Sequence, residues 1–344
     1  TWKLVETPFR RTPSVNRVRL TAIIAPSAIF FLVMGISGHL FIKDKHHILV
    51  GSDTLFLPKA FPGIVAESRH CSFPDLVEDK PCELPGSNVE DTSVIVLGDS
   101  LARVLTEAIQ ERRQMYSTMV DLSASGCPFL LGLSIYAGKN TSADCSLEYQ
   151  QLRLDYITQH KASKKVVILA GNWLVTYLED SFDNHVGGVS LNQNIVATSD
   201  ILASDNDVKE NFFASFERSL LSLSEQADQV VIVTPGYSNG WDPVRRAQRI
   251  YRQVDDKEML FEHLKIPLSP IQDRTKELDT LVNKLKMEAS NIKVIDTREI
   301  TCEENKGVCY AGDENGFFFS DDLHHSLYTN RIVAQTIENI INKL

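Results

Sequence analysis

Five short apolar runs, spread along residues 91–344, constrain the fold of this 344-residue chain most strongly. Each run is rich in Val, Ile or Leu and ends near Gly, Ser, Asp or Pro, which is typical of buried parallel strands. Helical patterns lie between them, and strands that alternate with helices favour an open, mainly parallel sheet in a three-layer α/β/α domain. The predicted strands are 93–97, 117–122, 165–170, 229–234 and 291–295, and the predicted helices are 101–112, 147–159, 209–226, 274–288 and 327–344.

The first 90 residues divide into three segments of different composition. Residues 1–20 are basic and polar, whereas residues 21–42 are almost free of charge and long enough to cross a bilayer as a helix. A signal peptide would also be basic and then apolar. No A-x-A cleavage site follows, so we favour a retained transmembrane helix. Residues 43–90 are rich in Pro, Gly and polar side chains, and we expect an extension packed on the domain of residues 91–344.

Charge is spread unevenly along the chain. Residues 1–50 hold seven Lys/Arg and two Asp/Glu, which gives them a net charge of +5. Because the net charge of the whole chain is −10, residues 51–344 carry −15. The positive-inside rule then places residues 1–20 in the cytoplasm and residues 43–344 outside the membrane. An acidic exported domain is unsuited to nucleic acid, because phosphates are neutralised by Lys and Arg.

Six cysteines follow the apolar segment. In an oxidising compartment, an even number predicts three disulfides. Zinc sites need spacings such as C-x-x-C, and the sequence has none, so we predict no metal site. Pairing of neighbours is the simplest of the fifteen connectivities, and it joins Cys71–Cys82, Cys127–Cys145 and Cys302–Cys309.

A serine follows the first predicted strand, which runs directly into Gly98-Asp99-Ser100. Active sites of such sheets form beyond the carboxyl ends of the strands. Ser100 would also begin a helix, and a helix N-terminus favours developing negative charge. The alternative is that Asp99 or Ser100 only caps the helix. We predict Ser100 as a catalytic nucleophile.

An acid–histidine segment lies near the C-terminus, with the sequence Asp-Asp-Leu-His-His-Ser at residues 321–326. An imidazole can take the proton of a serine hydroxyl, and a carboxylate can orient that imidazole. Two registers are open, Asp321/His324 and Asp322/His325. The structural alternative is a solvated acidic turn before a helix.

These motifs resemble those of the SGNH family of hydrolases and acyltransferases. Residues 123–128 (Ser-Ala-Ser-Gly-Cys-Pro) resemble its block with an oxyanion glycine. Residues 170–173 (Ala-Gly-Asn-Trp) resemble its block with an oxyanion asparagine, although the neighbours of the asparagine differ from the usual pattern. The resemblance implies catalytic roles for Ser100, His324 and Asp321, and an oxyanion hole formed by Ser100, Gly126 and Asn172. In that family a hydrophobic residue follows the histidine. His325 stands in that place here, so we favour His324 as the base.

The Ser-Gly-Cys-Pro form resembles the C-terminal SGNH domain of bacterial family 3 membrane acyltransferases, which include O-antigen O-acetyltransferases. Residues 2–11 resemble the end of their membrane domain. The resemblance implies that residues 1–20 end an upstream membrane acyltransferase domain, and that the chain lies in the bacterial inner membrane with residues 43–344 in the periplasm. The upstream domain would deliver an acyl group, with acetyl-CoA as a candidate donor. Ser100 would pass it to a hydroxyl of a surface polysaccharide such as lipopolysaccharide O-antigen, without a metal or organic cofactor.

Two other functions remain open at this point. An esterase or deacetylase would differ only in using water as the acceptor, and a non-catalytic glycan-binding domain would keep the fold alone. For glycan binding, we predict Trp173 as a stacking platform, because aromatic faces suit the apolar C–H surfaces of sugars. Packing in the core is the alternative for this side chain.

Overall fold

The computed structural model describes residues 81–88, 90–137, 145–178, 181–190, 195–198, 208–234, 236–250 and 257–344. No helix within these ranges is long and apolar enough to span a membrane. Several predictions lie outside them: the cytoplasmic segment 1–20, the transmembrane helix 21–42, most of the extension 43–90, and Cys71 of the first predicted disulfide.

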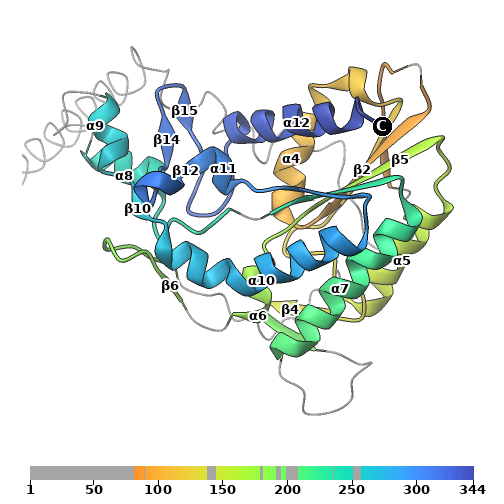
Figure 1. Ribbon diagram of the computed structural model, residues 1–344, viewed down its shortest axis with the longest axis horizontal. Helices are drawn as coiled ribbons and strands as arrows, with labels where there is room; N and C mark the ends of the chain where they lie inside the picture. The colour runs from red at the N-terminus through yellow and green to blue at the C-terminus, as the bar shows by residue number, and fades with distance from the viewer. Residues whose placement is uncertain are drawn as a thin grey trace, which may run out of the picture. The chain divides into compact units, whose positions relative to one another are not determined.

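A six-stranded sheet forms the centre of the domain, in the order β1-β3-β2-β5-β9-β11 (Figure 1). Its last five strands are parallel, and β1, from the predicted extension, pairs antiparallel with β3 at the edge. The prediction of a mainly parallel sheet is confirmed. The strands are β1 Cys82–Pro85, β2 Thr92–Gly98, β3 Thr118–Ser123, β5 Lys164–Ala170, β9 Gln229–Val233 and β11 Ile292–Ile295.

Helices cover both faces of this sheet, as the sequence predicts for a three-layer domain (Figure 1). The five predicted helices correspond to α4, α5, α7, α10 and α12, and each lies within a few residues of its predicted bounds. The largest difference is α10, which starts before residue 274 because Pro270 is tolerated in the first turn of a helix. The helices are α4 Ser100–Gln110, α5 Leu147–Gln159, α6 Leu174–Tyr177, α7 Val208–Gln226, α8 Pro243–Ile250, α9 Lys257–Glu262, α10 Ser269–Glu288, α11 Arg298–Thr301 and α12 Leu327–Ile341.

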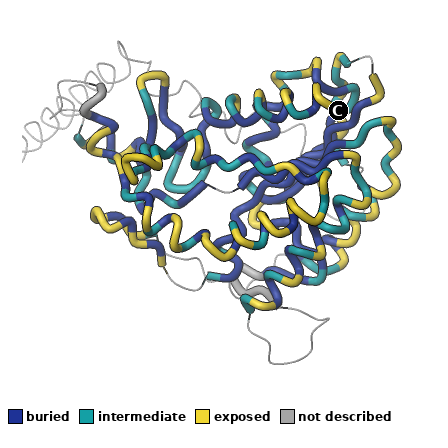
Figure 2. Tube along the Cα trace, in the orientation of Figure 1, coloured by how far each residue is buried: buried dark blue, intermediate teal, exposed yellow. Residues whose placement is uncertain are grey.

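The two core layers follow from the alternation of side chains along the strands. In β2, Val94 and Val96 belong to the apolar cluster that contains residues of α4 and α12. Ile95 and Leu97 belong to the opposite cluster, which contains residues of α7 and α10. All seven residues of β2 are buried, and the sheet is the most continuously buried part of the trace in Figure 2. Burial on both faces explains why β2 and β9 are nearly continuous apolar runs.

Short two-stranded and three-stranded ladders lie outside the central sheet, and the sequence patterns do not predict them. Most of these strands have only two residues, too few for a periodic pattern. They are β4 Ser134–Ala137 with β8 Ile195–Thr198, β6 Phe182–Asp183 with β7 Val189–Ser190, β10 Ile266–Pro267 with β13 Val308–Cys309 and β12 Cys302–Glu303, and β14 Gly312–Asp313 with β15 Gly316–Phe317.

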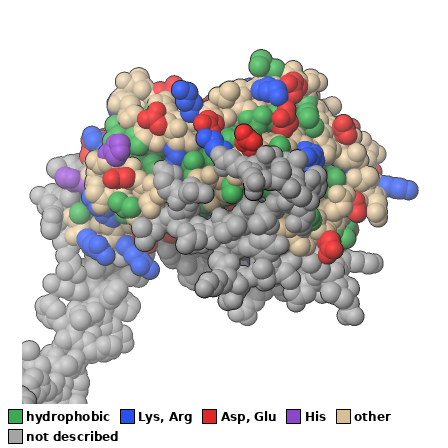
Figure 3. Space-filling model, turned by 90° about the horizontal axis from the view of Figure 1, so that it is seen from below, with side chains coloured by type: hydrophobic (Ala, Val, Ile, Leu, Met, Phe, Trp, Pro, Cys, Tyr) green, Lys and Arg blue, Asp and Glu red, His purple; other side chains and the backbone are tan. Residues whose placement is uncertain are grey.

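Two of the three predicted disulfides are confirmed, Cys127–Cys145 and Cys302–Cys309. The first joins the loop after β3 to the start of α5, and the second joins β12 to β13. Acidic and basic side chains are interspersed over the described part of the face in Figure 3.

The strand order also determines where a site can form. From β2 the chain crosses to β3 on one side and later returns to β5 on the other. The loops that follow β2 and β5 therefore diverge at the carboxyl edge of the sheet. In doubly wound folds, ligands bind at such a topological switch point.

Candidate active site

Ser100 begins α4 directly after β2, two residues beyond Gly98. At Gly98, φ is +142°, and an added Cβ would lie 1.7 Å from the carbonyl oxygen of Ala170 in β5. Only glycine permits this conformation and this close approach. The turn places Ser100 at the carboxyl edge of the sheet, among the first-turn amides of α4 that have no acceptor within the helix.

Asp99 joins the two loops at the switch point. Its carboxylate accepts the backbone N–H of Leu101 at 2.8 Å, which is the capping role considered as an alternative, and also the backbone N–H of Asn172 at 2.7 Å. Only 3% of Asp99 is exposed. Burial raises its pKa, while these hydrogen bonds and the charges of His324 and Arg153 oppose the shift. Asp99 therefore caps α4 and also holds the loop after β5 against it.

Ser100, His324 and Asp321 form a hydrogen-bonded chain. His324 Nε2 lies 2.9 Å from Ser100 Oγ, and His324 Nδ1 lies 2.8 Å from Asp321 Oδ2. Asp321 Oδ1 also accepts the backbone N–H groups of Leu323 and His324 at 2.8 and 2.7 Å. In this network, Nδ1 carries the imidazole proton and Nε2 accepts the proton of the serine hydroxyl. The structure brings together the three residues predicted as catalytic.

The electrostatics of His324 and Asp321 favour a charged imidazole. Burial alone would lower the pKa of His324, but the hydrogen bond and charge of Asp321, with the charges of Asp99 and Asp322, raise it overall. Burial alone would raise the pKa of Asp321, but its hydrogen bonds with His324 lower it overall. The site therefore stabilises the imidazolium that forms when His324 takes a proton.

The other register, Asp322/His325, has a different environment. His325 is 5% exposed and packs on the ring of Phe319, with ring centroids 5.2 Å apart. Burial, followed by the charge of His324, lowers the pKa of His325 to about 4. Asp322 accepts a hydrogen bond from the hydroxyl of Ser190 at 3.2 Å. His325 is therefore a buried neutral side chain, and His324 is the histidine at Ser100.

The two predicted oxyanion residues lie in the loops that follow β3 and β5. Gly126 occupies an exposed turn with φ +75°, and an added Cβ there would meet no atom of the described residues within 4 Å. Asn172 is mostly buried and lines a small pocket that Leu323 and Gly236 also line. Their roles as oxyanion donors stay predictions.

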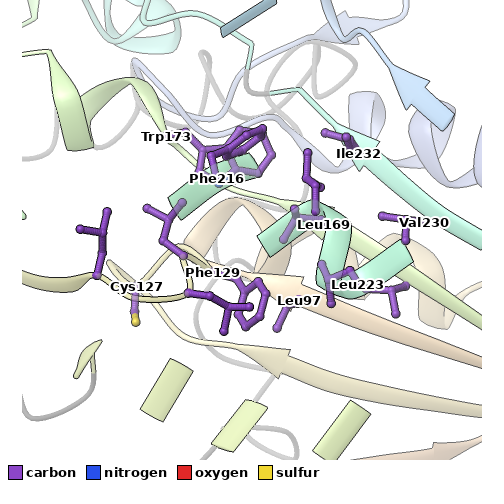
Figure 4. Close-up of a cluster of buried hydrophobic side chains, with 14 of the residues drawn as sticks. Leu97, Cys127, Phe129, Leu169, Trp173, Phe216, Leu223, Val230 and Ile232 are labelled. Carbon is purple, nitrogen blue, oxygen red and sulfur yellow. The ribbon is translucent and has the colours of Figure 1, made fainter. Parts of the chain in front are cut away.

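Trp173 requires a correction. Its side chain is 0% exposed, and its ring lies edge-to-face with Phe216 of α7, with centroids 5.1 Å apart (Figure 4). A ring without exposed surface has no face free for a sugar. The prediction of Trp173 as a stacking platform is wrong, because packing of the chain after β5 against α7 turns this side chain into the core.

Arg153 on α5 lies beside the site, although it belongs to none of the sequence motifs. It is 0% exposed and lies within hydrogen-bonding range of the carbonyl oxygens of Gly98 and Cys127. The sequence indicates this burial, because Arg153 lies on the same helical face as Tyr149 and Ile157, which are both buried. No group of His, Cys, Asp and Glu side chains in the described ranges is arranged to hold a metal ion.

Comparison with known proteins gives a family match and two matches to solved structures. A family model described as "SGNH domain (fused to AT3 domains)" matches residues 70–339. The periplasmic domain of a lipopolysaccharide acetyltransferase from Salmonella ser. Paratyphi A is 15% identical, with 74% of this chain and 85% of that chain covered and a TM-score of 0.47. A putative acylhydrolase from Bacteroides fragilis NCTC 9343 is 11% identical, with 76% and 90% covered and a TM-score of 0.36. No curated protein sequence matches the chain significantly.

Proposed function

This chain belongs to the family of SGNH domains that are fused to AT3 domains, and from that membership we propose that it is a serine O-acyltransferase acting on a bacterial surface polysaccharide. Lipopolysaccharide O-antigen is one such acceptor, and acetyl is the proposed acyl group. The observation that carries the proposal is the hydrogen-bonded chain from Ser100 through His324 to Asp321. Such a chain activates a hydroxyl that is otherwise a weak nucleophile.

The first half of the proposed reaction loads Ser100. Its Oγ attacks the carbonyl carbon of the acyl donor, and its proton passes to His324 Nε2, 2.9 Å away. Asp321 stabilises the imidazolium, and the N–H groups of Ser100 and Gly126 with the side chain of Asn172 face the oxyanion. Preorganised donors of this kind lower a barrier by several kcal/mol. The bond to the leaving group then breaks, and the leaving group takes the proton from Nε2.

The second half transfers the acyl group. A sugar hydroxyl gives its proton to His324 Nε2, and its oxygen attacks the acyl carbon. Ser100 Oγ leaves and recovers the proton from the imidazolium. The cycle needs no metal or organic cofactor. Water in place of the sugar would give hydrolysis, but the fusion of this family to AT3 domains supports transfer.

The proposed setting is the periplasm. An upstream AT3 domain in the same chain would supply the acyl group from the membrane, and residues 21–42 would anchor the domain there. The disulfides Cys127–Cys145 and Cys302–Cys309 support an oxidising compartment.

The test is a structural analysis of surface polysaccharide from cells with and without the gene. We expect ester-linked acyl groups on a sugar hydroxyl only when the gene is present. The purified full-length protein should also carry an acyl group on Ser100 when it is incubated with a donor, which mass spectrometry of its peptides detects. A gain of esters when the gene is removed would instead indicate an esterase. Identical polysaccharides from both strains would contradict either activity.

The pH dependence of the acylation rate should follow the ionisation of His324. The imidazole acts as a base only when neutral, so kcat/KM for acylation should rise with pH through an apparent pKa above the ordinary value of 6.5. Asp321→Asn removes the charge that raises this pKa, so the rising limb should move to lower pH while the rate falls. Rates with nitrophenyl acetate between about pH 5 and 9 would show it, since His is the group that titrates in this range. A limb that does not move in Asp321→Asn would contradict the assigned pair.

A further inference from the structure

The guanidinium of Arg153 is buried beside the site, and no carboxylate of the described residues forms an ion pair with it. Burial of a charge costs free energy unless hydrogen bonds replace the lost water. Burial lowers the pKa of Arg153 to about 10, and the nearby Tyr149 and Asp99 oppose the shift. Its guanidinium also lies 5.4 Å from the ring centroid of Phe129 and 4.8 Å from that of Tyr149. A charge retained in such surroundings calls for a role that an apolar residue could not fill.

The polar partners of Arg153 are mainly backbone carbonyls. Nη1 lies 3.3 Å from the oxygens of Gly98 and Cys127 and 3.4 Å from that of Leu122. Nη2 lies 3.5 Å from the oxygen of Pro128 and 2.5 Å from Gln150 Oε1. Each distance from the guanidinium to a carbonyl oxygen is long for a hydrogen bond, but the planar guanidinium group contacts all four carbonyls at once.

These carbonyls lie near the carboxyl ends of β2 and β3 and in the turn that follows β3, where the proposed chemistry takes place. Gly98 lies two residues before Ser100, and Cys127 follows Gly126. The Gly98 carbonyl also accepts the backbone N–H of Ala124, at 2.9 Å. Gly98 is thus the point at which Arg153, the nucleophile turn and the oxyanion turn meet.

We propose that Arg153 is a positioning residue of this site, whose buried guanidinium holds the turn carrying Ser100 and the turn carrying Gly126 at a fixed spacing. The proposal rests on the proposed acyl transfer. The spacing matters because the acyl carbon must lie within bonding reach of Ser100 Oγ while its oxygen faces the Gly126 N–H. Gln150 supports the arrangement: its Nε2 donates to the carbonyl of Pro128 at 3.0 Å while its Oε1 faces Arg153.

The test compares Arg153→Lys with Arg112→Lys in the full-length protein. Lysine keeps the charge at position 153 but cannot reach the carbonyls of both turns with one planar group. Arg112 is the matched control: its ion pair with Glu338, at 2.6 Å, is partly buried. It also follows the far end of α4, about 16 Å of helix from Ser100. The readouts are kcat and KM with nitrophenyl acetate below the melting temperature of each variant, and the rate of labelling by a fluorophosphonate.

We expect Arg153→Lys to lose about 10- to 100-fold in kcat with little change in KM, because a displaced turn misplaces reacting groups. Arg112→Lys should lose stability but keep its kcat. The proposal is overturned if folded Arg153→Lys keeps its kcat, or if both variants lose kcat only in proportion to their loss of folded protein. If Arg153→Lys does not fold, the kcat of Gln150→Met tests the proposal instead, because this change removes one hydrogen-bond partner of Arg153. A drop in kcat smaller than the one expected for Arg153→Lys supports the proposal, and an unchanged kcat overturns it. A wild-type protein that the fluorophosphonate does not label would contradict the proposed function instead.

Discussion

Replacing Ser100 with alanine is expected to leave a folded protein that no longer forms an acyl-enzyme or acylates polysaccharide. The hydroxyl contacts His324, and Ser100 is only partly buried, so its loss should leave the core intact. Its removal takes away the only atom that can carry the acyl group in the proposed reaction. We expect a loss of at least about three orders of magnitude in acyl transfer, as for other serine nucleophiles.

The measurement for Ser100→Ala combines labelling with polysaccharide analysis. The wild type should react with a fluorophosphonate and the variant should not, while both give the same melting temperature. Ser125→Ala is a matched control, because it removes a serine hydroxyl from the exposed turn beside Gly126. This hydroxyl accepts a hydrogen bond from Arg103. Full acylation of polysaccharide by folded Ser100→Ala would contradict a serine mechanism.

Replacing His324 with alanine should have an effect of similar size. His324 is the imidazole at Ser100, and members of a catalytic triad act as a unit, so the loss should again reach about three orders of magnitude or more. The neighbouring histidine supplies the control. His325→Leu places a hydrophobic side chain in a buried position, and Nε2 of His325 has no hydrogen-bond partner among the residues that the structure describes. We therefore expect near wild-type activity and little loss of stability.

The two histidine variants should be compared by acylation rate and by thermal melting. A large loss in His324→Ala without a change in melting temperature, with near-normal activity in His325→Leu, supports the assignment. The reverse pattern would mean that Asp322 and His325 form the working pair. The double variant should be no slower than His324→Ala alone.

Much of the sheet could be predicted because most residues of its parallel strands are buried. Such strands are largely apolar, so β2, β3, β5, β9 and β11 are visible as short segments rich in Val, Ile and Leu. The two-residue strands between residues 182 and 317 could not be predicted in this way. They are held by contacts with the rest of the domain, and their own side chains show no periodicity.

The candidate site was predictable as far as motifs and their order along the chain. Gly98 and Ser100 can be located because a tight strand-to-helix turn needs a glycine, here against Ala170, and a small polar residue at the helix start. The spacing of the residues alone left His324 and His325 both open, because both lie on one short turn, and only the family resemblance favoured His324. The decision came from Phe319, which packs on His325 and draws it into the core, and from Asp321, which accepts the backbone N–H of His324.

By itself, then, the sequence determined the alternation of strands and helices, the order of the motifs and two of the cysteine pairs, since these depend on local periodicity and spacing. Only the tertiary structure decided which side chains face the site and which face the core. Trp173 and Asn172 are adjacent in the chain, yet Trp173 packs against Phe216 of α7 while Asn172 borders a pocket. Arg153 is charged, yet it lies inside the domain under the two turns. The direction of a side chain after a strand depends on partners contributed by distant segments, and no local pattern encodes those partners.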